Sequence, residues 1–274
     1  MSRPERTRAT RLAIRQAIGL GALHGPAELL PISSSGHVAL IPWLLGWRYE
    51  ELDDDVRKSF EVALHAGTAA ALLITLHTEV WEALRRCDPR RSALVALSSV
   101  PPAIVGYTLE GPIERHLGTP PTIAAGLLAG SLAMVCADRT PQLRGQEDAR
   151  ARDALWLGVA QASALVPGVS RNGATLAAAR LRGFRREDAS RLSRHVALPV
   201  IAGATLLKGI RLRARGLPAP ALPPFAAGAA ASFASTVTCT WLIARVERDR
   251  SPLPYALYRA TLGAVVLATL ARRS

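Results

Sequence analysis

A short polar segment near the start of the chain interrupts otherwise apolar sequence. Within ten residues it contains a carboxylate, three consecutive hydroxyls, a glycine and an imidazole, and it reads Glu28-Leu-Leu-Pro-Ile-Ser-Ser-Ser-Gly-His37. Groups of these types can bind phosphate, accept a proton or attack as a nucleophile. In a bilayer, ionisable and unpaired backbone groups are costly and are found where they line a polar site. The segment is therefore the first candidate for a functional site.

The spacing within this segment indicates how its groups converge. His24 and Glu28 are four residues apart and share one face of a helix, which Pro31 is expected to end. His37 can serve as a base, a nucleophile or a phosphate partner. Between the proline and this histidine, a turn would bring together small groups that can contact a ligand: Ser33, Ser34, Ser35 and Gly36. The alternative for the serines is helix capping.

A second polar cluster follows Pro167 and is centred on Arg171. A guanidinium offers phosphate two parallel, charge-assisted hydrogen bonds. The backbone N–H groups of a glycine-rich turn at a helix start would add an anion cradle. The other candidate phosphate-binding residues in this cluster are Gly168, Ser170, Asn172 and Thr175. The alternative is a loop arginine that extends to lipid head groups.

Taken together, the two clusters suit phosphoryl transfer from an anionic lipid. They supply a carboxylate, one or two imidazoles, several hydroxyls and an arginine. The chain has no GxxxxGK[ST] motif of a P-loop nucleotide site. It also lacks the GxSxG motif of α/β-hydrolases.

The elements that would position these clusters are apolar helices. Of the 274 residues, 49% are hydrophobic, and the mean hydropathy is +0.18. Six apolar segments approach the roughly 17–25 residues that cross a bilayer, at about 59–77, 92–109, 120–137, 195–210, 222–244 and 255–271. The alternative is a soluble all-helical protein, but nearly all of these segments lack the polar stripe of a surface helix.

The net charge of +13 comes mainly from arginines in short loops. The basic loops 79–91, 138–153 and 180–194 are expected on the cytoplasmic side, and the loops 48–58 and 110–119 outside. The basic N-terminus and Lys208 to Arg215 do not fit this orientation. Such charge also attracts anionic lipids. Nucleic acid is not an expected partner, because the aromatic residues of a single-strand-binding surface are missing.

The polar stretch from Asp138 to Asp153 divides the chain into two similar halves. In each half an apolar, helix-like segment stops at a proline and is followed by small polar residues. Paired interrupted segments of this kind are typical of a midplane site built from broken helices. We therefore expect a single membrane domain over 1–274, with structural repeats at 1–140 and 150–274. The alternative is chance similarity between two stretches rich in Ala, Gly and Pro.

The two clusters resemble the signature regions of the bacterial undecaprenyl-diphosphate phosphatases, the BacA-type bacitracin-resistance family. The family pattern is (Glu/Gln)-x-x-x-Glu, then Pro-x-Ser-Ser-(Ser/Thr)-Gly-His, and later Pro-Gly-x-Ser-Arg-Ser-x-x-Thr. This chain matches it at Glu28, Pro31, Ser33, Ser34, Ser35, Gly36, His37, Pro167, Gly168, Ser170, Arg171 and Thr175. The match continues at Phe60-Glu61-Val62 and Gly67, and the order of spans is similar over nearly the whole length.

The resemblance implies an all-α integral membrane protein with six transmembrane helices plus two re-entrant helical hairpins in an inverted-topology repeat. It implies hydrolysis of undecaprenyl diphosphate outside the cytoplasm, in the plasma membrane, which recycles the carrier lipid for cell-wall synthesis and confers bacitracin resistance. It also implies a divalent cation, Mg²⁺ or Ca²⁺. The implied partners are the polyprenyl diphosphate and the membrane lipids. The resemblance is also compatible with a homodimer.

Carried over by position, the resemblance also assigns roles. Glu28 would hold the metal, with His24 beside it, or act as a base. Ser34 would be the nucleophile with His37 as its activating partner, or His37 would be the nucleophile itself. Arg171, with Ser170 and Thr175, would grip the diphosphate.

The chain departs from the family pattern at three positions. His24 replaces the first acid, which removes one negative charge and weakens a site for Mg²⁺, because hard cations prefer oxygen ligands. His65 stands where the family usually has glutamine. Asn172 replaces a serine, which retains hydrogen bonding but not nucleophilicity.

Two other functions fit the same residues. One is a diverged paralogue that acts on another lipid diphosphate. The other is a transporter or scramblase of polyprenyl phosphate built on the same repeat. Glu28, His37 and Arg171 together favour catalysis, since transport needs anion binding but no nucleophile.

Overall fold

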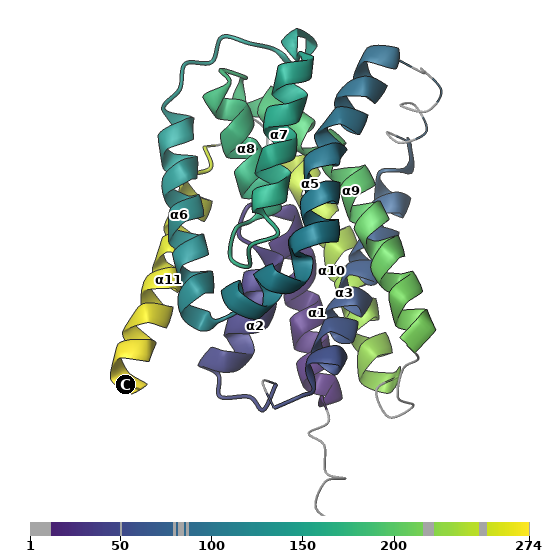
Figure 1. Cartoon of the computed structure of the whole chain (residues 1–274), viewed down its shortest axis with the longest axis vertical. Helices are drawn as coiled ribbons and strands as arrows, with labels where there is room; N and C mark the ends of the chain where they lie inside the picture. Colours follow the sequence, from purple (N-terminus) through teal and green to yellow (C-terminus); the bar gives the residue numbers. More distant parts are fainter. Residues whose placement is uncertain are drawn as a thin grey trace, which may run out of the picture.

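The computed structural model describes residues 12–49, 51–78, 81, 85, 88–215, 222–246 and 251–273. These residues form helices and no strand, which confirms the predicted all-α class (Figure 1). In chain order the helices are α1 (Ile14–Leu29), α2 (Ser34–Leu44), α3 (Asp54–Thr75), α5 (Pro89–Leu117), α6 (Pro120–Asp138), the 3₁₀ helix η1 (Gln146–Asp148), α7 (Ala151–Ser163), α8 (Arg171–Leu181), α9 (Arg186–Arg215), α10 (Leu222–Val246) and α11 (Leu253–Arg273).

Within the described part of the chain, four helices are long and apolar enough to cross a membrane. They lie in α5, α6, α10 and α11, at Pro89–Ile113, Pro120–Asp138, Leu222–Ile243 and Leu253–Arg273. Each exposes large apolar side chains, among them Ile104, Leu132, Trp241 and Leu257. Exposed apolar surface of this extent suits lipid and not water. The chain is therefore a multi-pass membrane protein. The other two predicted spans, 59–77 and 195–210, overlap α3 and α9, which are not among these four helices.

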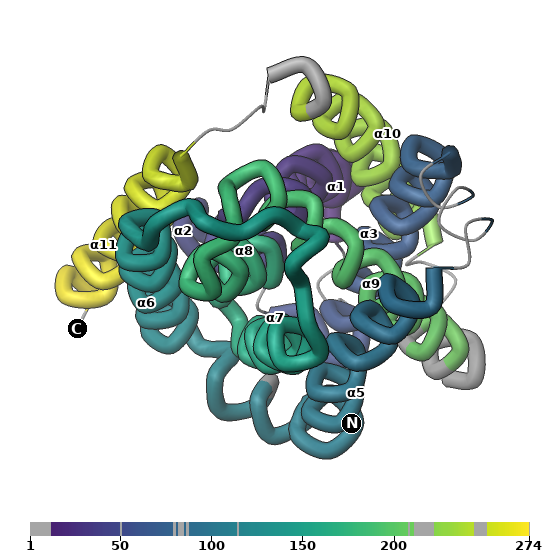
Figure 2. The backbone as a smooth tube through the Cα atoms, turned by 90° about the horizontal axis from the view of Figure 1, so that it is seen from above, coloured from purple at the N-terminus to yellow at the C-terminus, as the bar shows by residue number. Residues whose placement is uncertain are grey.

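Two pairs of short α-helices, α1–α2 and α7–α8, lie at the centre of the described structure. Figure 1 shows α1 and α2 in its lower half and α7 and α8 in its upper half, and Figure 2 shows longer helices around them. The predicted breaks at the two prolines are confirmed. Before Pro31, α1 ends at Leu29, and Pro167 lies in the loop between α7 and α8.

Small residues let α10 approach α1 closely. A Cβ atom on Gly21 would lie 2.2 Å from the backbone oxygen of Gly228, and one on Gly25 would lie 2.3 Å from Oγ of Ser235. Helices in membranes commonly associate through such small-residue contacts. The contact holds His24, which lies between these two glycines, against α10.

We expect Gly21→Ala to lower the thermal unfolding temperature of the purified protein in detergent, because the added methyl group would collide with the backbone of α10. Gly19→Ala on the same helix is the matched control. Its Cβ atom would meet nothing closer than 4.0 Å, and alanine is favoured over glycine in helices by about 1 kcal/mol. Equal effects of the two substitutions would contradict the close contact.

Basic loops gather at one end of the molecule. Arg144 and Arg182, from the loops 138–153 and 180–194, both donate hydrogen bonds to the buried carboxylate of Asp153. Burial of this carboxylate raises its pKa, but the hydrogen bonds from the two guanidinium groups outweigh burial and lower the pKa of Asp153 to about 2. The loop between α2 and α3 lies at the opposite end (Figure 1). Most of the predicted loop 79–91 and the N-terminus up to residue 11 lie outside the described residues.

Candidate functional site

The carboxylate of Glu28 is the point at which the two polar clusters meet. Its Oε2 accepts a hydrogen bond of 2.5 Å from the Ser34 hydroxyl. Its Oε1 accepts one of 2.8 Å from the guanidinium of Arg171, which lies 143 residues further along the chain. The structure thus brings together three of the four predicted catalytic residues.

The starts of two helices point at this carboxylate. Helix α2 begins at Ser34 and α8 begins at Arg171, so the two residues that contact Glu28 occupy equivalent positions. The partial positive charge and the unpaired N–H groups of a helix start favour an anion. Two such ends beside one arginine form a site suited to phosphate.

Serine capping accounts for one hydroxyl in each cluster. The residue before each helix, Ser33 or Ser170, accepts a hydrogen bond from a glycine N–H three residues later, at 3.4 and 3.2 Å respectively. Ser33 has a positive φ of 79°, so the turn before α2 is tight. Capping is thus the reading that the structure supports for these two serines, while Ser34 is directed to the carboxylate.

Two predicted phosphate-binding residues connect the helices instead of surrounding Glu28. Asn172 donates from its side-chain amide to the Leu29 carbonyl at the end of α1, at 2.5 Å. Thr175 is buried, and its hydroxyl lies 2.9 Å from the Arg171 carbonyl and 2.5 Å from the Ser193 hydroxyl. These contacts fix the start of α8 against α1 and α9.

The predicted role of His37 as the activating partner of Ser34 requires a hydrogen bond between the two side chains. His37 instead bonds to other groups. The ring is buried, and its Nδ1 lies 2.7 Å from the Ser33 carbonyl. Since a carbonyl only accepts, Nδ1 donates, and Nε2 accepts from the Tyr258 hydroxyl at 2.8 Å. Both ring nitrogens are thus engaged, and the remaining partner of Ser34 is Glu28.

Of the other predicted residues, Ser35 and Gly36 lie in the first turn of α2, and Gly168 lies in the loop between α7 and α8. The Ser35 hydroxyl is 3.5 Å from that of Ser33. Gly36 and Gly168 lie where the start of α2 meets the loop between α7 and α8, since a Cβ atom on Gly36 would be 3.4 Å from the Gly168 Cα. Gly168 has a φ of 92°, which favours glycine, and its Cβ atom would meet the Ile123 carbonyl at 2.3 Å.

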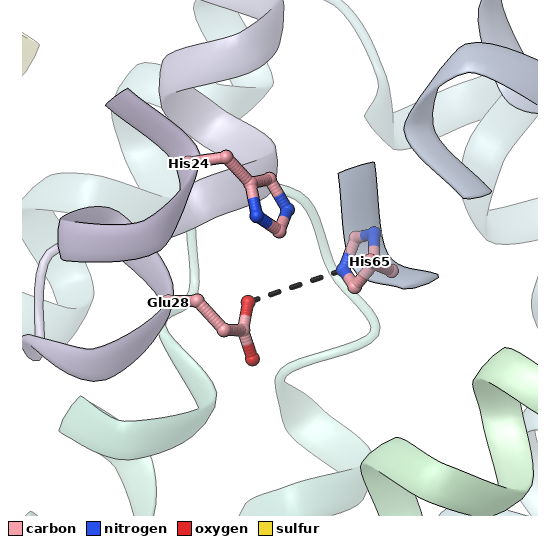
Figure 3. Close-up of side chains that lie close together, drawn as sticks. All are labelled: His24, Glu28 and His65. Carbon is pink, nitrogen blue, oxygen red and sulfur yellow. Dashed lines mark ion pairs between the residues drawn. The ribbon is translucent and has the colours of Figure 1, made fainter. Parts of the chain in front are cut away.

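His24, Glu28 and His65 form a group that could hold a metal ion (Figure 3). One ligand atom from each residue lies within 4.8 Å of the others. Nε2 of His65 is 3.9 Å from Glu28 Oε2, and the two imidazole rings meet edge to face at 4.6 Å. The sequence had placed His24 beside Glu28 but gave no role to His65, which comes from α3.

Sequence reasoning missed two residues of α11, Tyr258 and Arg259. Arg259 is fully buried and donates to the carbonyls of Pro31 at 3.1 Å and Gly168 at 3.2 Å, one in each loop. It therefore ties the two loops together behind the site. The available signal was its position: a lone charge inside the apolar span 255–271, which is a functional candidate by default.

We expect Arg259→Met to destabilise the protein by about 3 kcal/mol or more, because it leaves several buried carbonyls without donors. Thermal unfolding in detergent measures this loss, and hydrolytic activity should fall with it as the loops separate. The control is Arg115→Met on α5, where the side chain is exposed. An unfolding temperature unchanged from that of the control would contradict this bridging function.

Comparisons with known proteins agree with this geometry. Residues 17–265 match the family described as bacitracin resistance protein BacA. An undecaprenyl-diphosphatase of Geobacter sulfurreducens is 39% identical, over 95% of this chain and 99% of its own. Proteins of the same name from Chromohalobacter salexigens and Gemmatimonas aurantiaca are 36% and 35% identical, over 93% and 96% of this chain and 98% and 100% of theirs.

Proposed function

Since this chain belongs to the BacA family of bacitracin resistance proteins, we propose that it hydrolyses undecaprenyl diphosphate to undecaprenyl phosphate and inorganic phosphate. The product is the carrier lipid used again in cell-wall synthesis, and its regeneration gives resistance to bacitracin. The observation that carries the proposal is the contact of Glu28 with both Ser34 and Arg171 at two converging helix starts.

In the proposed mechanism, Ser34 is the nucleophile and Glu28 is its base. The 2.5 Å hydrogen bond between them supports this assignment, because the carboxylate is in place to take the hydroxyl proton. The Ser34 oxygen attacks the terminal phosphorus, and the bond to the bridging oxygen breaks. Undecaprenyl phosphate leaves and takes the proton from Glu28, which restores the carboxylate. Water activated by Glu28 then cleaves the phosphoserine and releases phosphate.

Arg171 and the helix starts supply the electrostatic part of the mechanism. Phosphoryl transfer depends mainly on positioning and on stabilising the charge spread over the equatorial oxygens. The guanidinium is held by Glu28 and lies at the first residue of α8, so it can turn one face of its fork to the phosphate. His37 and its partner Tyr258 then position the turn that carries Ser34.

A divalent cation is part of the proposal, held by Glu28 and His24 with His65 as a third ligand. A buried ring nitrogen supports it: Nε2 of His24 has no hydrogen-bond partner among the described residues. When bound, such an ion would neutralise negative charge on the diphosphate. The resemblance to the family gives Mg²⁺ or Ca²⁺ for this ion, whereas two imidazoles are not their preferred ligands.

Helix lengths support a specific membrane arrangement. At 1.5 Å per residue, the 16 residues of α1 extend about 24 Å and the 11 residues of α8 about 17 Å, less than the roughly 30 Å hydrocarbon layer. We propose that α1–α2 and α7–α8 are re-entrant hairpins, and that α3 and α9 complete six spans.

The order of helices supports an inverted repeat of 1–140 and 150–274. Among the helices that the structure describes, each half runs as a short pair followed by three longer helices. The short helix α1 packs against α10, and its counterpart α7 packs against α5. The arginine-rich loops 138–153 and 180–194 support a cytoplasmic location for their end of the molecule, in the plasma membrane. The site would then be accessible from the extracytoplasmic side.

Phosphate release from C55 diphosphate by the purified protein in detergent tests the function. The proposal expects release, and expects Ser34→Ala to abolish it with the unfolding temperature unchanged. A C15 diphosphate and a lipid diphosphate without a prenyl tail test the paralogue alternative. Movement of C55 phosphate across vesicles without any release would contradict the enzyme and favour a transporter.

Homodimerisation stays a prediction, which light scattering of the detergent complex measures.

A further inference from the structure

Three groups that accept hydrogen bonds face one another beside the proposed phosphate site. Figure 3 shows the His24 ring, the Glu28 carboxylate and the His65 ring directed to a common point. His24 is 1% exposed, and its Nε2 has no hydrogen-bond partner among the described residues. A buried polar atom without a partner is uncommon, and an unseen ion is one of its standard explanations.

A chain of hydrogen bonds fixes the proton on the His24 ring. The Ser232 hydroxyl donates to the Leu64 carbonyl at 2.9 Å, so the Thr68 hydroxyl must supply the proton of its 2.8 Å contact with Ser232. Thr68 then has only a lone pair to offer, and Nδ1 of His24 donates to it at 2.9 Å. In the neutral ring, Nε2 therefore carries the lone pair and is the nitrogen without a hydrogen-bond partner among the described residues.

His65 is oriented in the same way. Its Nδ1 lies 2.9 Å from the carbonyl of Glu61, which can only accept, so Nδ1 carries the proton and Nε2 the lone pair. That Nε2 is 3.9 Å from Glu28 Oε2. Metal-binding histidines are held in this way, with one nitrogen hydrogen-bonded to the protein and the other free for the ion. Two lone pairs and a carboxylate placed in this way offer three ligand atoms to one cation.

We propose that His24, Glu28 and His65 bind a divalent transition-metal ion of the zinc class, in place of the Mg²⁺ or Ca²⁺ that the family resemblance implies. Hard cations take oxygen ligands, whereas imidazole suits Zn²⁺ and its neighbours. Two histidines and one glutamate with an open position are a ligand set of catalytic zinc sites. Both imidazoles stand at positions where the family pattern has an acid or a glutamine.

The geometry needs only a small contraction. Tetrahedral zinc with ligands at about 2.0–2.1 Å holds them about 3.4 Å apart, against the 4.8 Å or less seen here. The His65 side chain is 37% exposed, which provides a path for the ion and for water or phosphate at the fourth position. Metal binding itself does not depend on the proposed reaction, although the ion would lie close to Ser34, which is hydrogen-bonded to Glu28.

Metal binding is measured on tag-free protein in detergent after removal of ions with a chelator. The proposal expects one equivalent of Zn²⁺ by elemental analysis, and retention in an excess of Mg²⁺ and Ca²⁺. It also expects Co²⁺ in the same site to show the intense visible absorption of four- or five-coordinate cobalt. Failure to bind Zn²⁺ or Co²⁺ saturably, or displacement by equal Mg²⁺, would overturn it.

Variants locate the site. The double substitution His24→Glu with His65→Gln restores the family pattern and should weaken Zn²⁺ binding at least about 100-fold, more than the 10–100-fold loss typical of residues that only orient a ligand. His65→Gln alone, at a partly exposed position, should weaken it too and serves if the double variant does not fold. His116→Asn, on the exposed end of α5, is the control and should bind as the parent does.

Arg171→Ala separates this inference from the proposed function. It should remove hydrolysis but keep Zn²⁺ bound, because Arg171 contacts Glu28 through the oxygen that does not face His65. Hydrolysis without saturable Zn²⁺ binding would overturn the metal inference and leave the phosphatase standing. Zn²⁺ binding by a protein that releases no phosphate would support the metal inference and overturn the proposed phosphatase activity.

Discussion

Glu28→Gln is expected to lower kcat/KM for C55 diphosphate by about 10²- to 10⁴-fold, the range that a lost general base covers. Glutamine keeps the size of the side chain and one accepting oxygen, but it cannot take the Ser34 proton across the 2.5 Å hydrogen bond. It also leaves the guanidinium of Arg171 without its anionic partner. The loss should appear in kcat more than in KM, because proton transfer belongs to the chemical step.

Single-turnover phosphate release, at substrate concentrations above KM, measures that chemical step. The control is Glu147→Gln, an exposed acid in the loop between α6 and α7. It should leave kcat unchanged. Thermal unfolding of both variants separates a chemical loss from a folding loss. A Glu28→Gln variant that retains more than a tenth of the parent kcat would remove Glu28 from the role of base.

The local features of the site could be predicted because local residues determine them. Pro31 and Pro167 disfavour helix in their vicinity, and α1 ends two residues before Pro31 while Pro167 falls between α7 and α8. Serine followed three residues later by glycine provides the cap that starts each of the next helices. The sequence therefore predicts the broken helices and the polar residues at the helix starts.

Contacts between distant segments could not be predicted in the same way. Arg259 lies 228 residues from the Pro31 carbonyl it binds, and no local pattern encodes that partner. His65 enters the site from α3 because α10 packs closely against both α1 and α3. His37 and Thr175 have the right chemistry for phosphate, but tertiary partners, Tyr258 and Ser193, engage their polar atoms. Residue type predicts what a group can do, whereas packing decides which group it meets.

Arg171→Ala is expected to lower kcat/KM by about 10³- to 10⁵-fold, as for arginines that stabilise transferring phosphoryl groups. The substitution removes the guanidinium that contacts Glu28 at 2.8 Å, and with it a positive charge that attracts the incoming diphosphate. Both KM and kcat should therefore worsen, in contrast to Ser34→Ala, for which binding should persist while turnover stops.

The Arg171→Lys variant shows whether the loss of activity comes from the missing positive charge or from the missing planar guanidinium group. Lysine restores the positive charge but not the planar fork, so it cannot donate to Glu28 and to phosphate in parallel. We expect it to recover KM more than kcat, since a point charge still attracts the diphosphate in the ground state while the transition state loses its directed hydrogen bonds. Recovery of the full kcat would mean that Arg171 acts only as a counter-charge. Phosphate would then be positioned by the starts of α2 and α8 alone.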